Sequence, residues 1–346
     1  MKQPFAILSN YFSQKNCTFA AEILKSVQIQ FMINRELLRT KVVQTLYSYH
    51  KGNTVTHLMA EKELFHNIER TYDLYFQLLQ LSIEITNYAL DRIEYKRNKL
   101  RPLPEDLNPN PRFINNRFVK QLSENIQFND YLSKQKLSWV NYPDIIKGLY
   151  EEITESDFYQ EYMAASVSDY NADKDIWRKI FKKIVLQSED VDNAIEEQSI
   201  YWVDDVEVVI SFVIKTIKRF EAENGAHQPL LPMFKDDEDE EFARKLLIGT
   251  LKNGESYREM IDQNTRNWDL DRIAFMDILI MQVALTEIID FPTIPVNVTL
   301  NEFIEIAKKY STDKSGTFIN GVLDKIVSHL KAENKLIKVK TFSDKK

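Results

Sequence analysis

The sequence predicts an all-α protein, and three features carry this prediction. Apolar side chains recur at spacings of three and four residues along most of the 346-residue chain, as one face of a helix requires. Only seven residues are glycine, which argues against turn-dense β architectures. Prolines separate the periodic stretches, most densely in the segment RPLPEDLNPNPRF. We therefore expect helices joined by loops and essentially no β-sheet.

The first 31 residues differ from the rest in their charge. They hold only four charged side chains, about half the density of the whole chain. A strong helical pattern begins only after Met32. We predict that Met32 is the real start and that residues 1–31 are a loose tail or an incorrectly assigned start. The alternative is a genuine N-terminal helix.

The first two thirds of the chain are expected to fold as a series of helices. Asn34 is a suitable N-cap for the first of them, and Gly52 a suitable stop. The segment 204–223 is rich in Val and Ile, but it runs about 20 residues without a breaker, so its length favours a helix. The expected helices are 34–50, 57–99, 113–136, 143–154, 157–166, 173–187 and 204–223.

The last third begins after GAHQPLLPMF (225–234), which we interpret as a linker. The six acids of 236–241 fit a helix N-terminus, where carboxylates favour the helix dipole. They could instead form an acidic docking strip. The 269–290 helix is apolar nearly all round, which is typical of a helix buried at the centre of a bundle. Helices are expected at 237–252, 255–265, 269–290, 297–310 and 316–330.

The composition excludes several classes of protein and site. No apolar run is long enough to span a membrane. The sole cysteine, Cys17, excludes a disulfide framework and a thiolate metal cluster. The net charge of −7 excludes a uniformly basic nucleic-acid coat, so an RNA contact would need a local patch. The five histidines lack metal-ligand spacing and no catalytic motif stands out, so we predict neither a metal nor a catalytic site.

Five segments, in the correct order, resemble the NusB family of transcription antitermination factors. They are RELLRTKVVQTLYSY (35–49), FARKLLIGTL (242–251), NWDLDRIAFMDILIMQVALTEI (267–288), IPVNVTLNEFIEIAKKY (294–310) and FINGVLDKI (318–326). The resemblance makes 32–51 the first helix of a NusB-like core and 237–330 its C-terminal helical bundle. Residues 52–236 then form a large helical insertion, and 331–346 a basic tail.

The resemblance implies a helical core of two packed bundles and a function in bacterial transcription. It implies a cytoplasmic factor that binds boxA-type ribosomal RNA together with NusE, a ribosomal protein. The pair would act within the antitermination complex of RNA polymerase. The resemblance implies no catalysis and no cofactor.

The resemblance also carries RNA-binding positions to this chain. Arg35 and Arg39 lie four residues apart and so share a helix face, and Lys41 adds a charge on another side. Glu36 and Leu37 stand where arginine is common in the family, so the basic patch is weaker. We expect weak RNA binding by the chain alone, with NusE supplying much of the affinity. The other positions carried over are Gln44, Tyr47, Tyr310, Lys314 and Phe318.

Each of these positions has a structural alternative. The two arginines could lie on a solvated helix face. Tyr310 and Phe318 could be core residues rather than rings that stack on an unpaired base.

Asp277 is the most informative acid because it lies within an almost wholly apolar helix. A buried carboxylate without a partner would cost several kcal/mol, so Asp277 is expected to reach the surface or a cation. In the family, an acid at this place faces NusE. We therefore predict that Asp277 binds that partner.

Two rival functions remain. NusB-like domains also occur fused to RNA cytosine methyltransferases, but that function would need a doubly wound α/β domain with a glycine-rich loop and a catalytic cysteine, so we expect this rival to be wrong. The second rival is a protein–protein scaffold without direct RNA binding. This scaffold function is favoured if the insertion covers Arg35 and Arg39, or if the insertion's aromatic residues form an interface rather than a core. These residues are Tyr72, Tyr75, Phe76, Trp139, Tyr142, Trp177 and Trp202.

The basic tail could also take part in RNA binding. Residues 331–346 hold six lysines against two acids, a net charge of +4. It could touch RNA phosphates or be only solvated.

Overall fold

The computed structural model describes residues 32–52, 56–167, 169–265 and 273–339, and every regular element in these ranges is a helix. The predicted all-α class is thereby confirmed. Within these ranges, no helix is both long and apolar enough to cross a membrane. The predictions for 1–31, and for the tail from residue 340 onward, concern residues outside the described ones.

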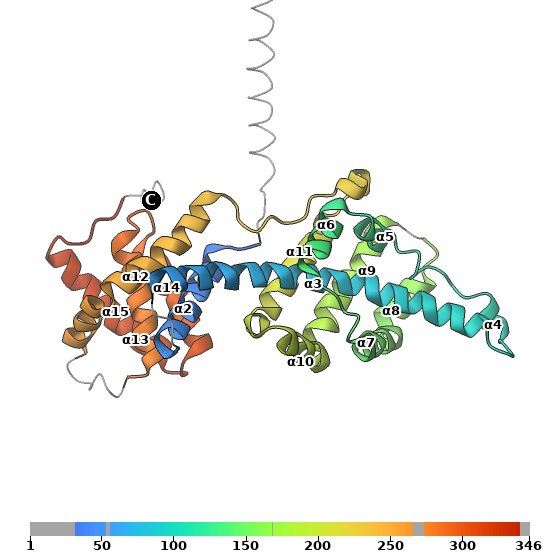
Figure 1. Ribbon diagram of the computed structural model, residues 1–346, viewed down its shortest axis with the longest axis horizontal. Helices are drawn as coiled ribbons and strands as arrows, with labels where there is room; N and C mark the ends of the chain where they lie inside the picture. The colour runs from blue at the N-terminus through green and yellow to red at the C-terminus, as the bar shows by residue number, and fades with distance from the viewer. Residues whose placement is uncertain (1–31, 53–55, 168, 266–272, 340–346) are drawn as a thin grey trace, which may run out of the picture.

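One bundle combines helices from both ends of the described chain (Figure 1). The first helix packs against the helices of the last third, and successive helices of the last third pack against one another. The members are α2 (Arg35–Lys51), α12 (Asp237–Asn264), α13 (Phe275–Asp290), α14 (Val296–Tyr310) and α15 (Ser315–Ala332).

The long helix α3 (His57–Arg97) joins this bundle to the insertion. Figure 1 shows it running from α12–α15 at one end of the molecule to α4 at the other. Its length of 41 residues corresponds to about 60 Å. The helices of the insertion are α4 (Pro104–Leu107), α5 (Arg117–Ser123), α6 (Ile126–Gln135), α7 (Pro143–Glu155), α8 (Asp157–Ala164), α9 (Tyr170–Lys183), α10 (Glu189–Gln198) and α11 (Val206–Arg219), with 3-10 turns at Val185–Gln187, Ile200–Trp202 and Ala222–His227.

After the insertion, the backbone runs beside the segment that precedes α2. The backbone N–H of Met32 donates to the carbonyl of Pro232 at 3.0 Å, and that of Ile33 to Met233 at 2.9 Å. The Asn34 side chain then accepts from the Leu37 N–H, which confirms the predicted N-cap of α2. These contacts align α2 with the entry to α12.

Three helix predictions need correction. The expected 113–136 helix is two helices, because Asn125 caps a new one and its side chain also donates to the Gln228 carbonyl. The expected break near residue 253 is absent, and α12 is continuous. Its Gly249 faces α13 so closely that a Cβ there would lie 2.7 Å from Thr286 Cγ2. Helix α10 was not expected at all.

The acidic run and the insertion's aromatic residues fall where the simpler interpretation placed them. Asp236 is the N-cap of α12, and the following acids form its first turn. Six of the seven aromatic side chains considered for an interface are buried, and Tyr142 is partly buried against the core. The insertion therefore has a hydrophobic core of its own, continuous with that of the bundle.

Candidate nucleic-acid interface

The side chain of Arg39 points into the bundle rather than into solvent. It is only 4% exposed, and its Nε and Nη2 donate to both oxygens of Glu287 at 2.7 and 3.0 Å. Its Nη1 donates to Glu302 at 3.1 Å. Arg39 and Arg35 do share a face, as expected, since both guanidinium groups lie over the ring of Phe242. That face is covered by α12, α13 and α14, which corrects the expectation of an RNA contact for Arg39.

Arg35 is the more accessible of the two arginines. Its side chain is 40% exposed, and its Nε pairs with Asp239 of α12 at 3.1 Å. The predicted solvent-facing charge is therefore partly neutralised by the acidic first turn of α12.

Lys41 is buried by the insertion. Its Nζ donates to Asp205 at 2.5 Å and to Asn67 of α3 at 2.8 Å, and the side chains of Lys41 and Asp205 are each 1% exposed. Thr71 also donates to Asp205. Burial lowers the pKa of Lys41, although the neighbouring Asp205 opposes the shift. The predicted RNA contact of Lys41 is corrected, because its charge belongs to an internal ion pair.

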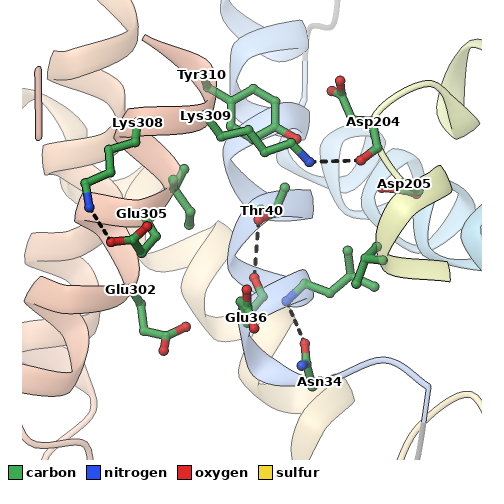
Figure 2. A pocket seen from close by; sticks show the side chains of 13 residues that line it. Asn34, Glu36, Thr40, Asp204, Asp205, Glu302, Glu305, Lys308, Lys309 and Tyr310 are labelled. Carbon is green, nitrogen blue, oxygen red and sulfur yellow. Dashed lines mark hydrogen bonds and ion pairs between the residues drawn. The ribbon is translucent and has the colours of Figure 1, made fainter. Parts of the chain in front are cut away.

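A hollow of about 520 Å³ lies between α2, α14 and the start of α11, and we call it the acidic hollow (Figure 2). Of its two lysines, Lys308 pairs with Glu305 at 2.6 Å and Lys309 donates to the Asp204 carbonyl at 2.9 Å. Burial raises the pKa of Glu302, and nearby carboxylates add to the shift. This surface therefore disfavours a phosphate. Its carboxylates are Glu36, Asp204, Asp205, Glu302 and Glu305.

Gln44, Tyr47 and Tyr310 line a second hollow of about 440 Å³. The Gln44 amide donates to Asp204 at 3.0 Å and to the Tyr310 hydroxyl at 3.1 Å. Burial raises the pKa of Tyr310, with Asp204 adding to the effect. The insertion thus reaches two of these three predicted residues, while Tyr47 remains 40% exposed.

Two residues missed by the sequence analysis join Tyr47. The ring of Phe275, at the start of α13, lies 5.9 Å from that of Tyr47. The Nζ of Lys51, one helical turn after Tyr47, lies 4.4 Å above the Phe275 ring. The i, i+4 spacing of Tyr47 and Lys51 could have indicated this group.

Lys314, Phe318 and Asp277 line a third hollow of about 610 Å³, beyond the first turn of α13. Lys314 is exposed and Phe318 partly buried. Met276 borders the second hollow and Ala274 the third, so the α13 turn connects the two. We call Tyr47, Lys51, Phe275, Lys314 and Phe318 the basic-aromatic surface.

The carboxylate of Asp277 has hydrogen-bond partners that the sequence analysis did not predict. It is 6% exposed, and it accepts from the hydroxyls of Ser311 at 2.6 Å and Ser315 at 2.9 Å. It also lies in the first turn of α13, where the helix dipole favours a negative charge. The expectation that it needs the surface or a cation is therefore corrected, although it does line the third hollow.

The described part of the basic tail contacts the loop between α13 and α14 through Lys338. The Nζ of Lys338 donates to the carbonyls of Phe291 and Ile294. In the described ranges, no group of three or more His, Cys, Asp or Glu side chains could hold a metal ion.

Comparison with known proteins gives this arrangement a family. A family model described as NusB family matches residues 212–328, so the matched region starts within α11, upstream of the expected boundary at 237. The chain is 39% identical over 132 residues to the transcription antitermination protein NusB of Salinibacter ruber, covering 36% of this chain and 82% of that protein. It is 45% identical over 93 residues to the NusB of Bacillus licheniformis, covering 27% and 72%.

No solved structure matches the chain. The coverage of the Salinibacter protein at this identity shows that the chain belongs to the NusB family.

Proposed function

We propose that this chain is a non-catalytic transcription antitermination factor that binds boxA-type ribosomal RNA together with NusE, within the antitermination complex of RNA polymerase. The names of its relatives support the antitermination role. The observation that carries the RNA part is the group at the junction of α2 and α13, in which the exposed Tyr47 and Lys51 flank the partly buried Phe275. An aromatic ring beside a cation suits an unpaired base and its phosphate.

The same geometry predicts weak RNA binding by the chain alone. Of the cations first considered on α2, Arg39 and Lys41 are buried in ion pairs, and Arg35 is paired with Asp239. Lys51 and Lys314 are the cations that the basic-aromatic surface presents to solvent. Each phosphate neutralised on a single strand adds about −0.7 to the slope of log affinity against log salt. Two contacts give a shallow slope and a modest affinity.

NusE is the proposed second source of affinity, and the third hollow is its proposed site. Asp277 lines this hollow beside Lys314 and Phe318. A basic protein would be attracted to its carboxylate. RNA and NusE would then meet at neighbouring parts of the same surface.

The test measures the affinity of labelled boxA RNA for the full chain by fluorescence anisotropy, with and without NusE. Tyr47→Ala should weaken RNA binding about tenfold, because a stacked base contributes about 1–3 kcal/mol. Lys51→Gln and Lys314→Gln should each reduce the salt slope. Lys120→Gln on α5 and Lys182→Gln on α9 are matched controls, since both lysines are exposed and distant in the fold from this surface.

Two results would contradict the proposal. One is wild-type binding that is equally strong for boxA RNA and an unrelated RNA, with NusE adding nothing. The other is full retention of RNA affinity in Tyr47→Ala combined with Lys51→Gln, which would favour the protein–protein scaffold.

A further inference from the structure

The C-terminal part of α3 carries a second group of cations and aromatic rings, far from the NusB-like bundle. Arg92, Tyr95, Lys96 and Lys99 follow an i, i+3, i+4, i+7 spacing, which places them on one face of a helix. Asn98 caps α3, and the Lys99 N–H still donates to the Lys96 carbonyl, so the turn continues to Lys99. The end of α3 therefore carries a stripe of three cations around one tyrosine, in which Arg92 is partly buried and the other residues are exposed.

The ring of this tyrosine is open to solvent. Tyr95 is 64% exposed, and the Nζ of Lys99 lies 6.0 Å from its ring centroid. An exposed ring next to a cation offers both a stacking platform and a charge for the adjoining phosphate.

The cations of the stripe are not neutralised by carboxylates. Throughout the described ranges, Arg92, Lys96, Lys99 and Arg101 form no ion pair. Elsewhere on the surface, Lys134, Arg178 and Lys308 each pair with an acid three or four residues away. Cations at a helix C-terminus do favour the helix dipole, but Lys99 and Arg101 lie beyond the helical residues.

The nearest acids on α3 are Asp91 and Glu94. The helical period rotates Glu94 away from the stripe, whereas Asp91 lies four residues before Tyr95 and borders it, and neither forms an ion pair with the stripe within the described residues. Residues 92–103 hold five cations and one acid in a chain whose net charge is −7. The end of α3 is thus a local positive surface on an acidic protein.

We propose that this surface, which we call the α3 stripe (Arg92, Tyr95, Lys96, Lys99 and the adjoining Arg101), is a second binding site for single-stranded RNA. The proposal rests on the proposed function, because the ligand would be the same transcript that the basic-aromatic surface contacts. Tyr49 and His57 lie 6.5 Å apart between ring centroids, so α3 begins beside the basic-aromatic surface. It ends about 60 Å away, at the stripe (Figure 1). The insertion would then lengthen the RNA footprint of a core whose own cations are largely paired.

The separation between the two surfaces allows a direct test with RNA length. A stacked strand rises about 3.4 Å per nucleotide, so about 10 nucleotides span roughly 34 Å and about 40 span roughly 136 Å. We would measure the binding of a boxA RNA of each length to the full chain by fluorescence anisotropy at several salt concentrations. The variants are Lys96→Gln/Lys99→Gln/Arg101→Gln and Tyr95→Ala. The control for the loss of three charges is Lys120→Gln/Lys179→Gln/Lys182→Gln, since these lysines are also exposed.

The proposal expects a loss confined to the long RNA. The triple variant should bind it about tenfold more weakly, with a salt slope reduced by about 2, since three phosphate contacts are lost. Tyr95→Ala should lower the affinity for the long RNA at every salt concentration without changing the slope of log affinity against log salt. The control and all binding of the short RNA should be unaffected.

The possible failures are distinguishable. Unchanged binding of the long RNA in the triple variant overturns the proposal, while wild-type binding of the short RNA still supports the proposed function. Equal losses for both RNA lengths also overturn it, because the effect would not be local. If wild-type protein binds only the long RNA and the triple variant abolishes this, the α3 stripe stands and the boxA role fails. Stripe-dependent binding to anionic lipid vesicles without any RNA effect overturns the proposal in favour of a membrane contact.

Discussion

The cations at the two ends of α3 have opposite environments. Beside its start, Arg39 and Lys41 of α2 are almost fully buried and paired with carboxylates. At its end, Lys96, Lys99 and Arg101 are exposed, and they form no ion pair within the described residues. Both groups look alike in sequence, as basic residues at helical spacing. The difference shows that spacing reports which residues share a face, whereas the covering elements decide whether that face can meet RNA.

The insertion itself produces part of this difference. Its Asp205 closes over Lys41, and its Asp204 contacts Gln44. An acidic turn thus lies on a helix whose counterparts in the family are expected to bind RNA. At its distal end the same insertion presents exposed cations that form no ion pair within the described residues.

Among the variants that test this difference, Lys41→Ala should have the largest effect on stability. It leaves Asp205 buried without its partner, and removing one member of a buried ion pair costs about 3–5 kcal/mol. The free energy of unfolding in urea, followed by circular dichroism, should fall by about this amount. Lys62→Ala, an exposed lysine on α3, should change it little.

A second variant separates charge from packing at the same place. Lys41→Met/Asp205→Asn removes both charges, so it should recover part of the loss. A loss below about 1 kcal/mol in Lys41→Ala would contradict the buried pair and reopen Lys41 as an RNA contact.

Arg39→Lys should have a smaller effect, and it sharpens the distinction between stability and RNA binding. The ammonium keeps the charge but cannot hold both oxygens of Glu287 as the guanidinium does. Losing hydrogen bonds between charged groups should lower the free energy of unfolding by about 2 kcal/mol. RNA affinity per folded molecule should stay unchanged, as measured by anisotropy below the unfolding midpoint. Weaker RNA binding without a loss of stability would instead make Arg39 a phosphate contact.

The helical class was predictable from periodicity, and the packing of α2 on the helices of the last third followed from the family resemblance. Helical periodicity predicted most helices, and the caps at Asn34 and Gly52 were correctly identified for α2. Helix breaks were less predictable. Gly249 allows the close packing of α12 on α13, and Gly254 lies within the continuous helix, where its carbonyl accepts from Gln282 of α13. An isolated glycine does not reveal which of these roles it has.

The candidate site was predictable only in part. Tyr47, Lys314 and Phe318 lie around connected hollows, and their contact with RNA stays a prediction from the family resemblance. The burial of Arg39 depends on Glu287, which lies 248 positions away, and that of Lys41 on Asp205 in the insertion. Partners so distant in sequence are set by the tertiary fold, and no local pattern encodes them. Phe275 was missed because it was interpreted only as part of a buried apolar helix.

The smallest expected effect concerns the acidic hollow. Burial raises the pKa of Glu302 above its ordinary value of 4.5, and the charge of Glu36 adds to this shift. Between 4.5 and the raised pKa, the folded state binds more protons than the unfolded state, so the contribution of Glu302 to stability falls as pH rises through this window. Glu36→Gln removes one of the neighbouring carboxylates, so the pKa of Glu302 should move down and the window should narrow. Carbon-13 NMR titration of the glutamate carboxyls would measure this change directly, with Glu196→Gln on α10 as the control. An unchanged Glu302 titration would mean that the charges of this hollow do not act on one another. The acidic hollow would then lose its electrostatic reason for excluding phosphate, and the contrast between the two ends of α3 would rest on the buried ion pairs alone.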